Sequence, residues 1–195
     1  GRELGGSVIG IIGMTPAARP LAQLLDTFGS RVIGYDPAVH AGDSLWGRWS
    51  VEPVPLRELM ESSDGVCVLL TYFTRYHGLL GTRYLADCKP SQVLVSLAPS
   101  GLFDDHALAQ ALATGRMAAA WFDSMEPGML DPGRPLHDVD NALTAYGTEQ
   151  RRQRLLAEIA HLQDQSRKPD ALIETKPKDL IDPLKNSDVQ GRSLK

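Results

Sequence analysis

The sequence predicts an α/β fold in which one doubly wound parallel sheet lies between two layers of helices. Three observations predict it. Short apolar runs rich in β-branched residues recur between residues 7 and 145, as expected of parallel strands that are buried on both faces. Segments with helical periodicity alternate with these runs. The 195 residues, of which 43% are hydrophobic, are enough to build one sizeable core.

A strand at 7–12 opens the predicted fold, and a helix follows it at once. Thr15 suits the N-cap of this helix and Pro16 its first position, while Gly29 suits its C-cap. Pro20, one turn in, is expected to bend the helix. One face of the helix is apolar and is formed by Ala18, Leu21, Ala22, Leu25 and Phe28.

Strands and helices continue to alternate up to residue 145. Further strands are predicted at 31–36, 65–70, 92–97, 118–123 and 142–145. Further helices are predicted at 55–63, 81–87 and 104–114. The region 46–55 is predicted to be an irregular loop, and we expect Trp46 and Trp49 to pack on the sheet edge rather than to bind a partner.

The first domain is predicted to span residues 1–147. Residues 148–168 follow as a charged helix with one apolar stripe. Residues 169–195 are rich in Lys, Asp and Pro, which is typical of an extended or disordered tail. The stripe of the helix is formed by Leu155, Leu156, Ile159 and Leu162.

Composition excludes several classes of partner. The formal net charge is -4 and no basic block is present, so we expect no direct nucleic-acid binding. No stretch approaches the roughly 20 apolar residues of a membrane span, so we expect no membrane partner. Cys67 and Cys88 form no metal-ligand pattern, and their use favours a reducing intracellular compartment, cytoplasmic or nuclear. Cys67 lies in an apolar run and is expected to be buried.

The turn after the first strand resembles a dinucleotide-binding fingerprint. Gly13 supplies the first glycine, Thr15 stands where the second belongs, and Ala18 is an accepted replacement for the third. Asp36, at the end of the second strand, suits the hydroxyls of an adenosine ribose. The sequence therefore predicts a Rossmann-type fold with a weakened NAD(H) site, in which Pro16 removes one helix N–H. In the alternative interpretation, the sheet no longer binds nucleotide and Thr15 only caps the helix.

Several segments together resemble the NAD-binding domain of D-isomer-specific 2-hydroxyacid dehydrogenases, and the resemblance covers about residues 1–168. The segments are Gly1–Leu4, Val8–Gly13, Gly34–Pro37, Leu85–Ser96, Leu102–Gly115 and Ala119–Pro127. The resemblance implies NAD(H) as cofactor and a homodimer. It implies cofactor contacts at Gly13, Met14, Thr15, Pro16, Asp36, Pro37, Leu97, Ala98 and Asp123.

Finer features resemble one branch of this family. Leu108–Leu112 resembles the C-terminal-binding protein corepressors, while 13–19 and 146–150 are similar to their plant angustifolia relatives. This likeness implies protein partners. The family's substrate domain is largely missing from these residues, so we expect 148–168 to return toward a domain that this chain does not supply. We do not expect the chain alone to form a substrate cleft.

Active family members use an Arg, a Glu and a His. The resemblance places Pro99 at the Arg position and Tyr146 at the His position, so that only Glu126 remains, after a shortened loop. Proline cannot hold a carboxylate, and a tyrosine with an ordinary pKa near ~10 is a poor base at neutral pH. Asp123 matches a position that contacts the nicotinamide amide, although it could equally cap the next loop. His137 is expected to be a surface histidine rather than a relocated base.

Three functional hypotheses follow. The leading one is a degenerate NAD(H)-binding domain that acts as a non-catalytic scaffold or corepressor-like regulatory module. Its rival is an active NAD-dependent oxidoreductase of 2-hydroxy or 2-oxo acids, with a site rebuilt around Tyr146 and Glu126. The third is a structural domain that binds no nucleotide.

Overall fold

The computed structural model describes residues 3–144, 156–157 and 159–161. The chain divides into two compact units, 1–152 and 153–195. In the second unit the described residues are helical, and they fall within the helix predicted at 148–168. The remainder of that helix, Tyr146 and the predicted tail lie outside the described residues.

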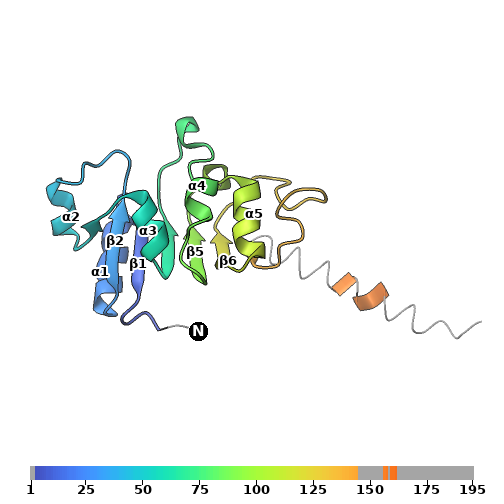
Figure 1. Ribbon diagram of the computed structural model, residues 1–195, viewed down its shortest axis with the longest axis horizontal. Coiled ribbons are helices and arrows are strands. Elements are labelled where there is room, and N and C mark those ends of the chain that lie inside the picture. The colour runs from blue at the N-terminus through green and yellow to red at the C-terminus, as the bar shows by residue number, and fades with distance from the viewer. Residues whose placement is uncertain (1–2, 145–155, 158, 162–195) are drawn as a thin grey trace, which may run out of the picture. The chain divides into compact units, whose positions relative to one another are not determined.

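The first unit is built on a seven-stranded sheet in which every neighbouring pair of strands is parallel (Figure 1). Its order is β3-β2-β1-β4-β5-β6-β7, so the direction of winding reverses between β1 and β4. This reversal is the topological switch point of a doubly wound fold, and the predicted fold class is confirmed. The strands are β1 (Val8–Ile12), β2 (Arg31–Tyr35), β3 (Glu52–Pro53), β4 (Gly65–Val68), β5 (Gln92–Ser96), β6 (Met117–Phe122) and β7 (Ala142–Thr144).

Helices cover both faces of the sheet. Alternate residues of β1 point to opposite faces: Ile11 packs in a cluster with α1, whereas Ile12 packs in a second cluster with α3, α4 and α5. The helices are α1 (Ala18–Thr27), α2 (Ser44–Arg48), α3 (Leu56–Ser62), α4 (Thr82–Leu85) and α5 (Asp105–Ala113), with short 3-10 turns η1 (Thr74–Tyr76) and η2 (Ser100–Leu102).

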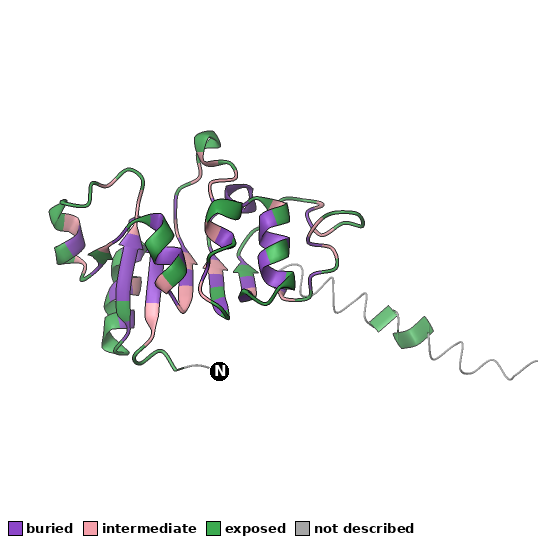
Figure 2. Ribbon diagram, in the orientation of Figure 1, coloured by how far each residue is buried: buried purple, intermediate pink, exposed green. Residues whose placement is uncertain are grey.

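The face that carries α1 is covered over only part of its width (Figure 2). Ile11 on β1 is fully buried, but Val93 on β5 is 43% exposed and Trp121 on β6 is 36% exposed. Cys67 on β4 shares this face, because it is in register with both Ile11 and Val95. Within residues 3–144, β5 and β6 are therefore less covered on this face than β1 is.

Two local predictions are wrong, the start of α1 and the burial of Cys67. Helix α1 begins at Ala18 with Ala17 as its N-cap, and no side chain caps it, so Thr15 and Pro16 precede the helix. Pro20 consequently falls in the first turn, where backbone N–H groups have no partner within the helix. Cys67 is half-buried rather than buried, because the less covered part of the sheet begins there, whereas Cys88 is buried.

The region 46–55 contains regular structure instead of the predicted loop. Helix α2 begins after Asp43, whose carboxylate accepts a hydrogen bond from Leu45 N at 2.8 Å. Trp46 is 3% exposed and donates its indole N–H to His40 O at 2.9 Å, so its packing is confirmed. Hydrophobic periodicity is read over windows of about 11–18 residues. It therefore could not detect a helix of five residues and a strand of two.

Two further properties concern only the described residues. None of their helices is long and apolar enough to cross a membrane. Within 3–144 and the short described stretches after it, no three His, Cys, Asp or Glu side chains gather in a way that could hold a metal ion.

Candidate functional site

The turn after β1 is the best-formed part of the predicted nucleotide site. Gly13 has a φ of +99°, and its N–H donates to Tyr35 O at 2.8 Å. A Cβ at this position would lie 2.5 Å from Leu70 Cα and would also collide with Leu70 N. Only glycine fits both the conformation and the space, so the fingerprint's first glycine has a structural reason here.

Asp36 is joined to this turn. Its Oδ2 accepts a hydrogen bond from Met14 N at 2.7 Å, and its Oδ1 accepts one from Ala38 N at 2.8 Å. The Met14 side chain points into the core, where it is 7% exposed. Pro37 is exposed beside the carboxylate. A carboxylate has about four acceptor positions, so Asp36 keeps acceptor capacity for hydroxyl groups of a ligand.

The start of α1 lies where the sequence predicts the phosphates of a dinucleotide. Thr15 is half-buried and its carbonyl accepts the N–H of Ala18 at 2.9 Å, while Pro16 is exposed and has no N–H to offer. The first turn of α1 contains no acidic residue that would repel a phosphate. The helix dipole therefore favours an anion here, although the Thr15 side chain occupies space that a glycine would leave open.

The remaining predicted cofactor residues lie farther along the same edge. Leu97 donates its N–H to Val68 O and is 55% exposed, while Ala98 is 3% exposed. Asp123 donates its N–H to Ser96 O and its side chain is exposed. Asp36 and Asp123 follow β2 and β6, which are four strand spacings or about 19 Å apart. A ligand that reaches both must be extended and must cross the switch point.

A second group of residues meets at Gly101, just after Pro99. Pro99 is exposed and precedes η2, and Ser100 Oγ accepts a hydrogen bond from Glu126 N at 2.9 Å. A Cβ added to Gly101 would lie 2.7 Å from Glu126 Oε1 and 3.3 Å from Tyr72 Oη. Glu126 and Tyr72 therefore converge on one point from the loops after β6 and β4.

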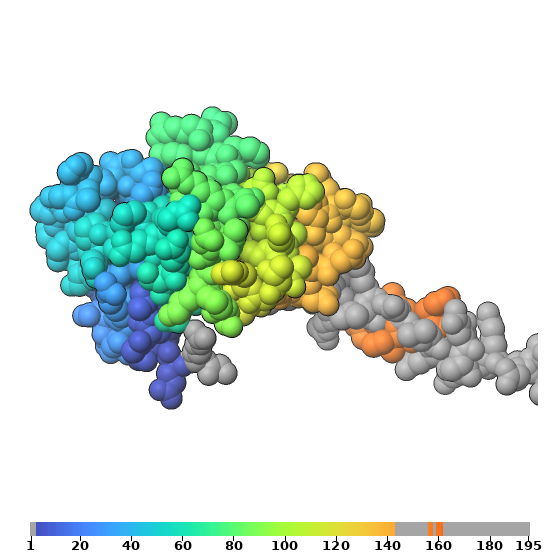
Figure 3. Space-filling view, in the orientation of Figure 1, coloured from blue at the N-terminus to red at the C-terminus, as the bar shows by residue number. Residues whose placement is uncertain are grey.

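The loop after β4 brings an imidazole to this group. Tyr72 Oη lies 3.3 Å from His77 Nδ1, close enough for a hydrogen bond in either direction. Figure 3 shows residues 71–78, in green, projecting beyond the neighbouring surface. His77 was not among the site residues predicted from the sequence. A signal was present, because a Tyr and a His five residues apart follow a strand at its carboxyl end, where ligands bind in such sheets.

The same loop holds a cation between two aromatic rings. The Arg75 guanidinium lies 5.0 Å from the centre of the Phe73 ring and 4.8 Å from that of Tyr76. It also donates to Tyr76 Oη at 3.0 Å. These cation–π contacts hold Arg75 on its own loop.

Burial and neighbouring charges shift two pKa values near the edge. The pKa of the Tyr35 hydroxyl is raised by burial and by the nearby Tyr84, Asp36 and Tyr76. Burial also raises the pKa of the Asp105 carboxyl, which Arg134 lowers and Glu126 raises. Asp105 and Glu126 therefore act as neighbouring negative charges, with Arg134 as a nearby positive one.

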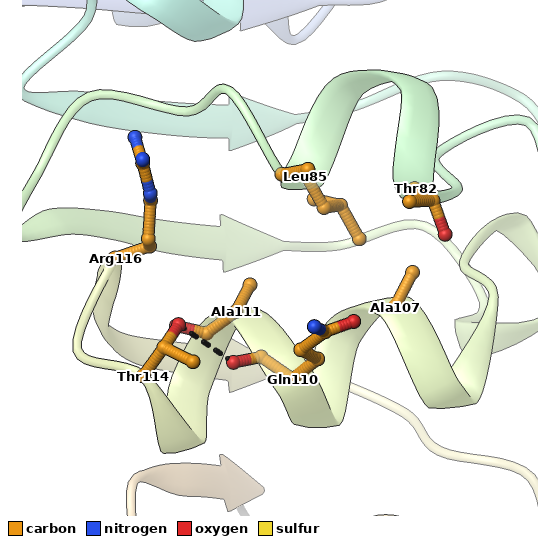
Figure 4. Close-up of a pocket in the computed structure, with 8 residues that line it drawn as sticks. Thr82, Leu85, Ala107, Gln110, Ala111, Thr114 and Arg116 are labelled. Carbon is orange, nitrogen blue, oxygen red and sulfur yellow. Dashed lines mark hydrogen bonds between the residues drawn. The ribbon is translucent and has the colours of Figure 1, made fainter.

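A groove of about 180 Å³ lies elsewhere, between α4 and α5 (Figure 4). Its floor is apolar and its rim carries Gln110 and Arg116, and Thr114 Oγ1 donates to Gln110 O at 2.8 Å. None of the predicted site residues lines it. The groove is therefore separate from the edge that carries Gly13 and Glu126.

His137, at 30% side-chain exposure, has its Nδ1 2.9 Å from Leu130 O.

Comparison with known proteins identifies the family. Residues 1–145 match the model of the D-isomer specific 2-hydroxyacid dehydrogenase, NAD binding domain. Human D-3-phosphoglycerate dehydrogenase is 32% identical over 123 residues, which are 63% of this chain and 23% of the relative. The Mycobacterium tuberculosis protein of the same name gives the same values. The chain thus spans about a quarter of the length of these relatives.

Solved structures show the same fold. D-lactate dehydrogenase from Escherichia coli superposes with a TM-score of 0.64 at 24% identity, over 74% of this chain and 45% of that one. NAD-dependent formate dehydrogenase from Staphylococcus aureus, in complex with NAD, gives 0.62 at 23% identity, over 74% of this chain and 42% of that one. The match of the family model to residues 1–145 shows that the chain belongs to the D-isomer specific 2-hydroxyacid dehydrogenase family and contains its NAD-binding domain.

Proposed function

We propose that this domain binds NAD(H) weakly and serves as a non-catalytic scaffold or regulatory module, akin to the corepressor branch of the family. The observation that carries the cofactor proposal is the hydrogen bond from Met14 N to Asp36 Oδ2. It fixes a carboxylate beside a glycine turn that cannot accept a side chain. That arrangement suits the ribose hydroxyls of an adenosine and repels a 2′-phosphate, so NAD(H) is preferred over NADP(H).

Weak binding follows from the phosphate end of the site. Thr15 replaces the glycine that lets a pyrophosphate approach the backbone, and Pro16 lacks the N–H that would donate to it. Both residues lie just before α1, next to the helix end where an anion gains most from the dipole. The adenosine contacts are retained while the phosphate contacts are reduced.

The proposed lack of catalysis rests on the residues at the family's catalytic positions. Pro99 stands where family members carry the arginine that grips the substrate carboxylate, and it has neither charge nor donor. Tyr146, at the histidine position, lies outside the described residues. A second candidate, an active oxidoreductase, is favoured by one observation only: His77 and Tyr72 place an imidazole and a phenol near Glu126.

Titration with NADH, followed by nicotinamide fluorescence, tests the cofactor proposal. We expect saturable binding that is weaker for NADPH. Thr15→Gly should bind NADH more tightly, because the pyrophosphate gains access to the backbone. Thr27→Ala, at the far end of the same helix, is the matched control. No binding of NADH at millimolar concentration would overturn the proposal, and an unchanged affinity of Thr15→Gly would show that the turn is not the obstacle.

Two further experiments test the non-catalytic role and the oligomeric state. NADH oxidation with a panel of 2-oxo acids should show no turnover by the chain or by any longer protein that contains it, and a measurable rate would contradict the non-catalytic role. We also propose a homodimer, as the resemblance implies. Light scattering should then give twice the chain mass of 21.2 kDa.

A further inference from the structure

The groove between α4 and α5 is open because short side chains face it. Ala107 and Ala111 lie one turn apart on α5, and both point toward Leu85 of α4 (Figure 4). Two methyl groups do not fill the space between the helices, and a volume of about 180 Å³ is left. An engineered cavity of about 150 Å³ in another protein binds benzene. The groove is therefore large enough for a ligand with the size of a six-membered ring.

One end of the groove carries a cation that has no acidic partner. Arg116 directly precedes β6 and is exposed, and it forms no ion pair with another residue in 3–144. None of the residues that line the groove is acidic. Asp87, which follows α4, is paired with Arg57 at 2.8 Å instead. A carboxylate in the groove would thus meet a guanidinium with free donors and no competing acid.

The rim of the groove adds hydrogen-bonding groups that the fold does not use. The side-chain amide of Gln110 and the hydroxyl of Thr82 make no hydrogen bond with other residues in 3–144. Thr114 is different, because its hydroxyl donates to Gln110 O at 2.8 Å. Figure 4 shows Thr82 and Arg116 at opposite ends of the groove, with Leu85 between them. The groove therefore combines an apolar middle with polar ends, of which one is positively charged.

We propose that this groove is a second binding site, for a small monocarboxylate with an aromatic or branched aliphatic body. The body lies between Leu85 and the two alanines of α5, and the carboxylate pairs with Arg116. Arg116 lies at the amino end of β6, whereas Gly13 and Asp36 follow the carboxyl ends of β1 and β2. The charged end of the groove is thus at the opposite edge of the sheet from the proposed NAD(H) site. The proposal goes beyond the proposed function and does not rest on it.

Benzoate, benzamide and acetate are matched probes of the two requirements. Benzamide keeps the ring of benzoate without its charge, and acetate keeps the carboxylate without the ring. The backbone amide resonances of α5 are followed by NMR in the whole chain without cofactor, at constant ionic strength. We expect benzoate to shift them saturably with a dissociation constant of about 1 mM, and the other two probes to bind at least about fivefold more weakly.

Three outcomes of this titration would overturn the proposal. Benzamide binding as tightly as benzoate would remove the need for an anion. Acetate binding as tightly as benzoate would remove the role of the apolar middle. No shift of the α5 resonances with benzoate at about ten times the expected dissociation constant would remove the site itself.

Charge variants test the role of Arg116. Arg116→Gln should weaken benzoate binding about fivefold, to the level of benzamide. Arg83→Gln is the matched control, because it makes the same change of charge on α4. The Arg83 guanidinium lies over the Tyr84 ring, 5.5 Å from its centre, and Arg83 does not line the groove. Equal losses in the two variants would mean that net charge, and not this site, attracts benzoate.

Filling variants test the groove without altering its charge. Ala86 is exposed and lines the groove, so Ala86→Leu should block benzoate. Ala113, at the end of α5, is also exposed but does not line the groove, so Ala113→Leu should bind benzoate as the wild type does. Unchanged binding by Ala86→Leu would contradict the proposed location.

A titration in the presence of NADH separates this proposal from that of the cofactor site. Benzoate should bind equally well with and without NADH. Competition between the two, with benzoate shifting the resonance of Gly13 instead of those of α5, would place the carboxylate in the nucleotide site and overturn the second site. Because the first titration contains no cofactor, a failure of NADH to bind leaves its outcome unaffected.

Discussion

The carboxyl ends of β1 and β2 can be compared with those of β5 and β6, since both belong to one edge of one parallel sheet. At β1 and β2, Gly13 is pressed against Leu70 and Asp36 is hydrogen-bonded to Met14. At β5 and β6, Pro99 carries neither charge nor donor, and Glu126 meets Tyr72 near Gly101. Under the proposed function, the difference teaches that the adenosine end of a dinucleotide site can be kept while the reacting end is rebuilt.

The two ends also differ in how the sheet beneath them is covered. Ile11 of β1 is fully buried under α1, while Val93 of β5 is 43% exposed on the same face. Burial on both faces holds β1 rigidly under the nucleotide turn. Within residues 3–144, β5 is less covered on this face than β1 is.

The largest expected effect comes from Gly13→Ala. The φ of +99° and the collision with the Leu70 backbone both oppose a side chain, and together we expect them to cost more than about 3 kcal/mol of unfolding free energy. Urea unfolding measures it. Gly29→Ala, at a φ of +78° where an added Cβ would meet only Gly5 Cα at 4.0 Å, should lose only about 1–2 kcal/mol. Equal losses would show that the contact with Leu70 contributes nothing.

Ile11→Ala and Val93→Ala should differ strongly in stability. Ile11 is fully buried, so its truncation should cost about 2–4 kcal/mol. Val93 is 43% exposed and should cost less than about 1 kcal/mol. Denaturant midpoints of the two variants give the comparison. A large loss in Val93→Ala would mean that this strand is covered in solution.

Asp36→Ala should weaken NADH binding about tenfold, because it removes the acceptor for the ribose hydroxyls, a change of about 1.4 kcal/mol. It also frees the Met14 N–H, so a smaller loss of stability accompanies it. Fluorescence titration measures the affinity, and Asp26→Ala on α1, exposed and distant in sequence from the turn, is the control. The preference of the wild type for NADH over NADPH should shrink in Asp36→Ala.

The smallest effect concerns pH. Burial, Glu126 and Asp104 raise the pKa of Asp105 above its ordinary value, against Arg134 and His106. The folded state thus binds a proton at a pH where the unfolded state has released it, so this carboxyl lowers stability as pH rises through its folded pKa. Asp105→Asn should therefore gain stability relative to the wild type between pH 4 and pH 7. A constant difference over that range would contradict the assignment.

The sequence was sufficient for the fold because its strands are nearly continuous apolar runs. It placed Gly13 in the turn after β1 and Asp36 directly after β2, where the structure has them, since a fingerprint at a strand end is a local pattern. It placed the N-cap of α1 at Thr15 in error, because Thr is a good cap in general but the chain here turns once more, to Ala17. It missed α2 and β3 because their lengths fall below any detectable period.

The approach of Tyr72 to Glu126 could not be predicted from the sequence. Tyr72 and Glu126 are 54 residues apart in the chain, and only the pairing of β4 with β5 and of β5 with β6 brings their loops together. The exposure of Cys67 could not be predicted from the sequence either. Its apolar neighbours predicted burial, but exposure depends on which helix covers the strand.

The contact between Gly13 and the Leu70 backbone ties two parts of the protein into one rigid piece. Leu70 precedes Tyr72 by only two residues, and Leu69 N is hydrogen-bonded to Ile12 O at 2.8 Å. Neither segment can be displaced without carrying the other along. A substitution that enlarges the side chain at Gly13 therefore also affects residues 71–78, and the two segments can be redesigned only together.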